Sequence, residues 1–157
     1  MADAPDLTLT AVGSERSFSL QAPGVITVII CLAQETEKDA AIIEDAVRER
    51  FPRPQDVLVV DVIDLRGVPG LFHKVAEGVL AGEHKKAVEA LPDGLDPHDH
   101  VIILPDWQGE VAKSFNLPEP SQTVCGAVLS ADGDVMGTYE GTTVANVFML
   151  IEYALTH

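Results

Sequence analysis

The stretch Gly24–Ala41, GVITVIICLAQETEKDAA, joins an apolar run to the start of a helix through a short polar link. Val25–Leu32 is rich in β-branched residues and carries no charge, which predicts a strand buried on both faces of a sheet. Thr36 is expected at the N-cap of the helix, because Thr36-Glu37-Lys38-Asp39 is similar to a capping box and acidic residues suit a first turn. The stretch therefore predicts a central strand that leads directly into a helix.

Apolar runs C-terminal to this stretch predict further strands, which together form a mixed sheet. Val57–Ile63 is a second buried strand, and a strand, a helix and a strand at this spacing predict a parallel crossover. Val124–Leu129 and Asp134–Tyr139 flank Asp132-Gly133, which is a strong signal for an antiparallel hairpin. Further elements are expected as a hairpin at Leu7–Thr10 and Ser17–Leu20, a short strand at Val101–Leu104, and helices at Glu110–Phe115 and Thr143–Leu155.

The segment between residues 67 and 98 is longer than a plain crossover needs. Leu71–Leu91 has mostly helical periodicity, with breaks expected around Gly78 and Gly82. We therefore expect residues 1–157 to form one domain that carries a helical insertion at about 67–98. The apolar side chains of the insertion either pack on the sheet or form the face of a homodimer, and the sequence leaves both alternatives open.

The strongly acidic composition restricts the classes of partner. The formal net charge is −15, and beyond Lys86 the only basic residue is Lys113. Nucleic acid and anionic membranes are bound through Lys and Arg, so we exclude both as partners. The charge then serves solubility or adaptation to salt, or it forms a docking surface for a basic protein. The N-terminus has neither the basic region nor the apolar region of a signal peptide, which predicts a cytoplasmic protein with reduced thiols.

Three short stretches carry a resemblance to a known superfamily. They are Phe18-Ser19-Leu20 with the strand after Gly24, the segment from Ile102 to Phe115, and Ala127–Val135 followed by Tyr139-Glu140-Gly141. In this order and spacing they resemble the thioredoxin-like superfamily, particularly its peroxiredoxin-like and TlpA-like branches. The resemblance runs from about Phe18 to Leu155. It implies an α/β fold of three layers, α/β/α, with a mixed central sheet and an N-terminal β-hairpin.

The positions that carry chemistry in that superfamily hold other residues here. Aligning Gly24 with the family's glycine places Thr36 at the first cysteine and Asp39 at the second. The family's cis-proline or arginine lies eight residues before Asp132, at a position that holds Val124 here. A threonine hydroxyl stays protonated at neutral pH and cannot replace a thiolate. The resemblance then implies a redox-inactive protein without a cofactor, which binds a protein or ligand at Gln34, Glu35, Thr36, Thr123 and Val124.

Two cysteines leave an enzymatic alternative open. Cys31 near the end of one strand and Cys125 near the start of another could lie close together in a thioredoxin-like sheet. The alternative is a peroxiredoxin-like antioxidant or oxidoreductase that uses one of these displaced thiols, or a redox-sensitive pair. An apolar setting favours two buried thiols that act as small hydrophobic residues, and it predicts slow reaction of both with a thiol reagent.

His98-Asp99-His100 is the only arrangement with the appearance of a metal motif. On an extended segment both imidazoles would point to one side, but zinc needs about three or four ligands. We therefore expect a solvated loop and no metal site. Trp107, which follows Asp106, is expected in a loop with a packing role.

Overall fold

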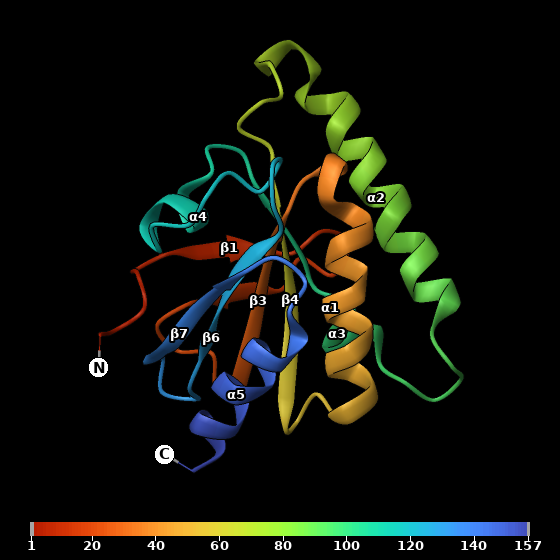
Figure 1. Ribbon diagram of the computed structural model, residues 1–157. Coiled ribbons are helices and arrows are strands. Elements are labelled where there is room, and N and C mark those ends of the chain that lie inside the picture. Colours follow the sequence, from red (N-terminus) through yellow and green to blue (C-terminus); the bar gives the residue numbers. More distant parts are fainter. Residues whose placement is uncertain (1, 157) are drawn as a thin grey trace.

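A five-stranded mixed sheet forms the centre of the computed structural model, which describes residues 2–156 (Figure 1). The strand order is β5-β4-β3-β6-β7, in which β3, β4 and β5 are parallel and β6 and β7 run antiparallel to their neighbours. The strands are β3 Ile26–Leu32, β4 Val57–Asp64, β5 Ile103–Asp106, β6 Cys125–Leu129 and β7 Val135–Glu140. The predicted parallel crossover and antiparallel hairpin are both confirmed.

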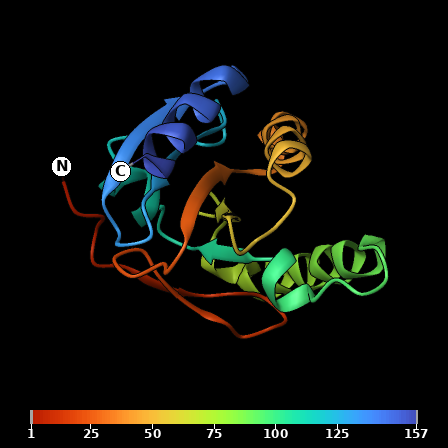
Figure 2. The ribbon, with the colours of Figure 1, turned by 90° about the horizontal axis from the view of Figure 1, so that it is seen from below.

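Helices and a small hairpin cover the two faces of this sheet (Figure 2). One face carries α1 (Glu37–Arg50) and α5 (Val144–Leu155). The other carries the hairpin of β1 (Thr8–Thr10) and β2 (Ser17–Ser19), together with α4 (Glu110–Ser114). α2 (His73–Ala90) lies to the side of the strands, where it contacts the hairpin turn at Gly13 and Trp107 after β5. The expected three-layer α/β/α fold with an N-terminal hairpin is therefore confirmed.

The central strand β3 contributes to both hydrophobic cores, as its unbroken apolar run predicts. Val28 and Ile30 pack with α1 and α5, whereas Ile29 and Cys31 pack with the hairpin and α4. Successive side chains of a strand point to opposite faces, so burial on both faces requires apolar residues at every position. This two-sided burial fixes the end of β3, and with it the start of α1.

One ionisable side chain interrupts the core beneath α1. Asp61 of β4 lies against Glu44 of α1, and the Oδ1 atom of Asp61 has no hydrogen-bond partner. Burial raises the pKa of Asp61 well above its ordinary value, and the nearby carboxylate of Glu44 raises it further. Arg48 donates to Glu44 and to the carbonyl of His100, and its charge opposes this rise. The two carboxyl groups form a pair in which the protonated form of Asp61 is favoured.

The insertion differs from its predicted form in two places. α2 is a continuous helix of 18 residues, preceded by the 3-10 turn η2 (Gly70–Phe72), so the breaks expected at Gly78 and Gly82 are wrong. Asp96 caps the short helix α3 (Pro97–His100), which the sequence analysis assigned to an extended loop. No helix among residues 2–156 is long and apolar enough to span a membrane.

Candidate functional site

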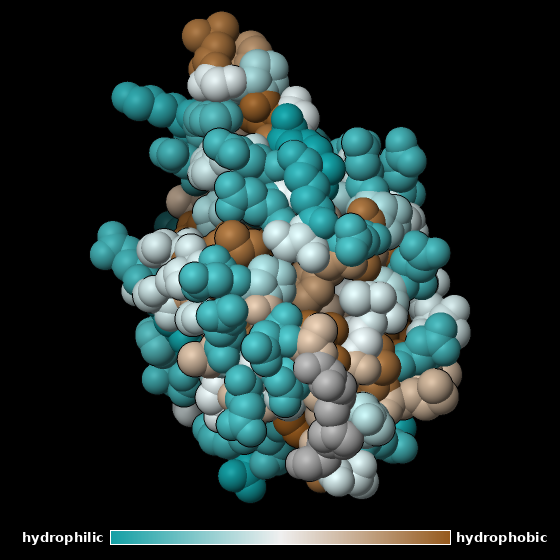
Figure 3. Space-filling model, turned by 90° about the vertical axis from the view of Figure 1, so that its left-hand side faces the viewer, coloured by the Kyte–Doolittle hydropathy of each residue, from teal (hydrophilic) through white to brown (hydrophobic). Residues whose placement is uncertain are grey.

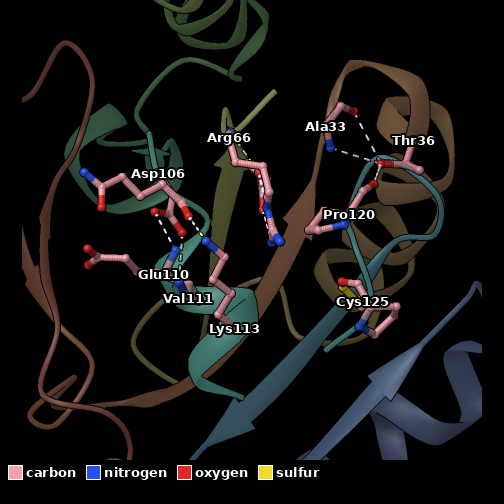
Figure 4. Close-up of polar contacts among 12 residues, drawn as sticks. Ala33, Thr36, Arg66, Asp106, Glu110, Val111, Lys113, Pro120 and Cys125 are labelled. Carbon is pink, nitrogen blue, oxygen red and sulfur yellow. Dashed lines mark hydrogen bonds and ion pairs between the residues drawn. The ribbon is translucent and has the colours of Figure 1, made fainter. Parts of the chain in front are cut away.

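The candidate site lies where the parallel strands end and the antiparallel strand β6 begins. The carboxyl ends of β3, β4 and β5 meet there, and the loop that precedes β6 lies beside them (Figure 4). Ligands of open α/β sheets commonly bind outside the carboxyl ends of strands, where side chains of several strands converge. The site contains Thr36, the two cysteines and a cluster of charged residues.

Thr36 ends the 3-10 turn η1 (Gln34–Thr36) and is the N-cap of α1. Its hydroxyl accepts a hydrogen bond from the amide of Ala33 at 3.0 Å and donates to the carbonyl of Pro120 at 2.6 Å. The helical start predicted at Thr36 is confirmed, but its side chain does not cap α1. It joins the link after β3 to the loop before β6, and its exposed fraction is only 5%.

The residues predicted to form a binding site divide into exposed and buried ones. Gln34 and Glu35 are exposed, and Thr123 is partly buried. Val124 and Thr36 are buried, so a bound molecule would contact them only after the loop moves. The hydrogen bond from Thr36 to Pro120 brings the two halves of this predicted site together.

Cys31 and Cys125 lie directly opposite each other on β3 and β6, as the sequence analysis anticipated. Both are free thiols and both are buried. Their side chains lie on the same face of the sheet, and the Sγ atom of Cys125 lies 3.6 Å from the carbonyl oxygen of Pro118. The pair is therefore enclosed between the sheet and the loop that precedes β6.

The two thiols differ in acidity. The hydrogen bond from Cys31 lowers the pKa of Cys125, and the charge of Arg66 acts in the same direction. That shared hydrogen bond, together with complete burial, raises the pKa of Cys31 well above its ordinary value. The pKa values of the two thiols thus shift in opposite directions, and the side chain of Cys125 has an exposed fraction of 0%.

A charged cluster that the sequence analysis missed borders the cysteines. Arg66 donates to both carboxylate oxygens of Asp64, with a shortest distance of 2.6 Å between Nη2 and Oδ2, and this hydrogen bond raises the pKa of Arg66. The guanidinium lies over Gly109, where an added Cβ would come within 2.3 Å of it. Figure 4 shows Arg66 between the start of α4 and the loop that carries Pro120 and leads to Cys125 of β6. The signal that could have indicated it is the Asp64-Leu65-Arg66 sequence at the end of a buried strand.

Asp106 at the end of β5 is buried and fixes the neighbouring helix. Its two carboxylate oxygens accept hydrogen bonds from the amides of Glu110 and Val111, at 3.0 and 2.9 Å. A carboxylate at this position satisfies amides that have no partner inside the helix and suits the helix dipole. Asp106 therefore has a structural role in holding Gly109 beneath Arg66.

The His98-Asp99-His100 motif does not assemble a metal site in the described part of the chain. It lies in α3, where His100 is buried and its Nδ1 atom is 2.9 Å from the carbonyl oxygen of Asp96. Among residues 2–156, no three His, Cys, Asp or Glu side chains are grouped so that they could hold a metal ion. Trp107 stacks on His73 with ring centroids 4.1 Å apart, which agrees with its expected packing role.

Comparison with known proteins identifies the architecture. No family model and no curated protein matches the sequence. BsSco, a member of the Sco family of cytochrome c oxidase assembly proteins, superposes with a TM-score of 0.63 at 15% identity, covering 98% of this chain and 94% of its own. The exposed lipoprotein thioredoxin Etrx1 of Streptococcus pneumoniae gives 0.61 at 17%, covering 95% and 99%. A putative thiol:disulfide interchange protein DsbE of Chlorobium tepidum gives 0.60 at 14%, covering 98% and 95%.

These similarities extend over nearly the whole chain, at identities that establish the fold alone. The order of the strands, the helix that follows β3 and the antiparallel pair β6–β7 agree with the resemblance noted in the sequence. The chain has the thioredoxin-like fold.

Proposed function

We propose that this chain is a thioredoxin-like binding protein without dithiol chemistry at the start of α1. The observation that carries the proposal is the environment of Thr36, the residue that the sequence resemblance aligns with the family's nucleophile. Its hydroxyl is buried and already joins two backbone groups, those of Ala33 and Pro120. A residue in this setting supports the shape of the site, because it offers neither a thiolate nor an accessible oxygen.

A protein with a basic surface is the partner that suits this site best. The exposed carboxylates of Glu35, Glu37, Asp39 and Glu119 surround the start of α1 and the adjoining loop, and we call this group the acidic edge. They belong to a chain with a net charge of −15, whose field attracts a basic protein over a distance set by the salt concentration. Complex formation through the acidic edge should therefore weaken as salt is added.

Affinity capture with paired charge reversals tests this proposal. The variant E35K/E37K reverses two charges at the acidic edge, and D45K/E49K reverses two exposed charges farther along the same helix. We expect at least one protein from a native lysate to be retained by the unaltered chain and by D45K/E49K, to be lost with E35K/E37K, and to elute when salt is raised. If every retained protein bound the two variants equally, the acidic edge would not be the binding site.

The register of the two cysteines favours a second candidate, a thiol-dependent reductase of hydroperoxides. The thiolate of Cys125 would attack one oxygen of the peroxide, break the O–O bond and release water or an alcohol, which leaves a sulfenic acid. The sulfur of Cys31 would then displace hydroxide from that sulfenic acid, and a disulfide and a second water would result. The two thiols supply both electrons for one peroxide, and further turnover needs an external dithiol such as dithiothreitol to reduce the disulfide. This route requires movement of the loop at 118–123, because Cys125 is buried beneath it.

Peroxide consumption separates the two candidates. The binding proposal predicts no turnover above that of the solution without protein, in the unaltered chain as in C31S and C125S. Turnover in the unaltered chain that disappears in both serine variants would establish the second candidate and overturn the first.

A further inference from the structure

We infer that the outward face of α2 is a self-association surface, through which two copies of this chain pair with their α2 helices antiparallel. The inference goes beyond the proposed binding at the acidic edge, because it concerns a different face. It starts from the attachment of α2 to the rest of the molecule. Leu80 is the one residue of this helix that is fully buried, although the helix has 18 residues.

The contacts of α2 with the rest of the chain lie along one side of the helix. His73 stacks on Trp107, and the ring of His84 lies so close to Gly13 that an added Cβ there would come within 2.3 Å of it. Leu80 lies between them on the same side, since these three positions are separated by 7 and 4 residues. One side of α2 between His73 and His84 thus faces the rest of the chain, and the helical periodicity places the opposite side outward.

That opposite side is apolar and exposed. Leu71 and Phe72 of η2 have exposed fractions of 87% and 52%, and Val75 and Val79 of α2 have 65% and 59%. Together with Gly82 they form the α2 face. Phe72, Val75, Val79 and Gly82 follow one another at intervals of 3, 4 and 3 residues, the spacing of a helix–helix interface. Figure 3 shows apolar side chains at the tip of the molecule, where Figure 1 places the turn before α2.

Charge favours a second copy as the molecule that covers this face. α2 carries three lysines and three glutamates, so the net charge of −15 resides entirely in the rest of the chain. A basic protein is attracted to that remainder, whereas α2 is where another strongly acidic molecule meets the least repulsion. A second copy is such a molecule, and most soluble homo-oligomers are two-fold dimers in which the same surface pairs with itself.

The shape of the α2 face suits an antiparallel two-fold pair. If Val75 of one copy packs against Val79 of the other, Phe72 then lies over Gly82 of the second copy. Apart from its chain neighbours and the backbone of its own helix, no atom lies within 4 Å of a Cβ added at Gly82, so the space above this glycine is open to a bulky side chain. A single helix pair is a small interface, and we therefore expect a reversible dimer that forms as the concentration rises.

Sedimentation equilibrium of the purified chain over a range of concentrations tests this inference. We expect a monomer–dimer equilibrium whose dissociation constant rises by about ten-fold or more in V75D/V79D. M149D is the matched control, since Met149 is an equally exposed apolar residue on α5, and it should leave the equilibrium unchanged. Dimerisation should strengthen when salt is raised, because screening reduces repulsion between the acidic copies. This response is opposite to that expected at the acidic edge, so the two proposals fail separately.

A second variant tests the packing with a stable fold. Gly82→Leu replaces a helix-weakening residue at an open position, so it should preserve or increase helix stability while it obstructs Phe72 of the other copy. We expect folded protein with a weakened dimer. A chain that stays monomeric at its highest soluble concentration would overturn the inference, as would a dimer that V75D/V79D and Gly82→Leu leave intact.

Discussion

Replacement of Thr36 by valine tests the role assigned to its hydroxyl. Valine has almost the same shape but leaves the amide of Ala33 and the carbonyl of Pro120 without the partner each has in the structure. A buried polar group that loses its partner costs about 1–3 kcal/mol. We expect Thr36→Val to lower the free energy of unfolding by about 2–4 kcal/mol in total. In a chain of this length that corresponds to a fall in Tm of about 5–12 °C.

Thr36→Ser is the matched control, because it keeps the hydroxyl and removes one methyl group. Its loss should be about 1 kcal/mol, the contribution of one buried methyl group. Urea denaturation of the three proteins at neutral pH gives both differences. If Thr36→Val and Thr36→Ser were destabilised equally, the hydroxyl would not join the two backbone groups, and the interpretation of Thr36 as the support of the site would be refuted.

Two further predictions concern the core around the site. Because the pKa of Asp61 is raised in the folded state, the native chain binds more protons than the unfolded chain, and the stability contributed by this group falls as pH rises above about 4. In urea denaturation at several pH values, D61N should therefore be more stable than the unaltered chain at pH 8, with a difference that shrinks toward pH 4. A constant difference would contradict the assignment. Gly126→Ala should lower the free energy of unfolding by about 3 kcal/mol, because the added Cβ would lie 1.8 Å from the carbonyl oxygen of Ile29 and near Tyr139. Gly67→Ala is the control, because Gly67 lies in open space, and it should change the free energy of unfolding by less than about 1 kcal/mol.

The sequence could predict the elements whose signals are local. The apolar run of β3 and the acidic first turn of α1 identify their junction from residues that are neighbours in the chain. The pairing of Cys31 with Cys125 followed once the superfamily's sheet order was assumed, because the order fixes which strands are adjacent. These predictions depend on the periodicity of the sequence and on the sheet order that the resemblance implies.

The features that were missed arise from tertiary contacts or from competing local effects. Arg66 lies over Gly109, 43 positions away in the sequence, and no local pattern indicates that contact. α2 continues through two glycines because each costs only about 1 kcal/mol, which the surrounding helix formers offset. The short helix α3 has a local signal in Asp96-Pro97, a capping residue before a proline at the first helical position, which the prediction of a loop left out.

The rate at which a thiol reagent modifies the native chain distinguishes a binding protein from a thiol-dependent enzyme. A protein that binds without thiol chemistry should hold both cysteines inaccessible, as their burial between β3, β6 and the loop before β6 implies. We predict that Cys31 and Cys125 react far more slowly in the native chain than in the same chain unfolded in denaturant. Modification of either cysteine at the rate of the unfolded chain would contradict the account and favour a thiol-dependent enzyme.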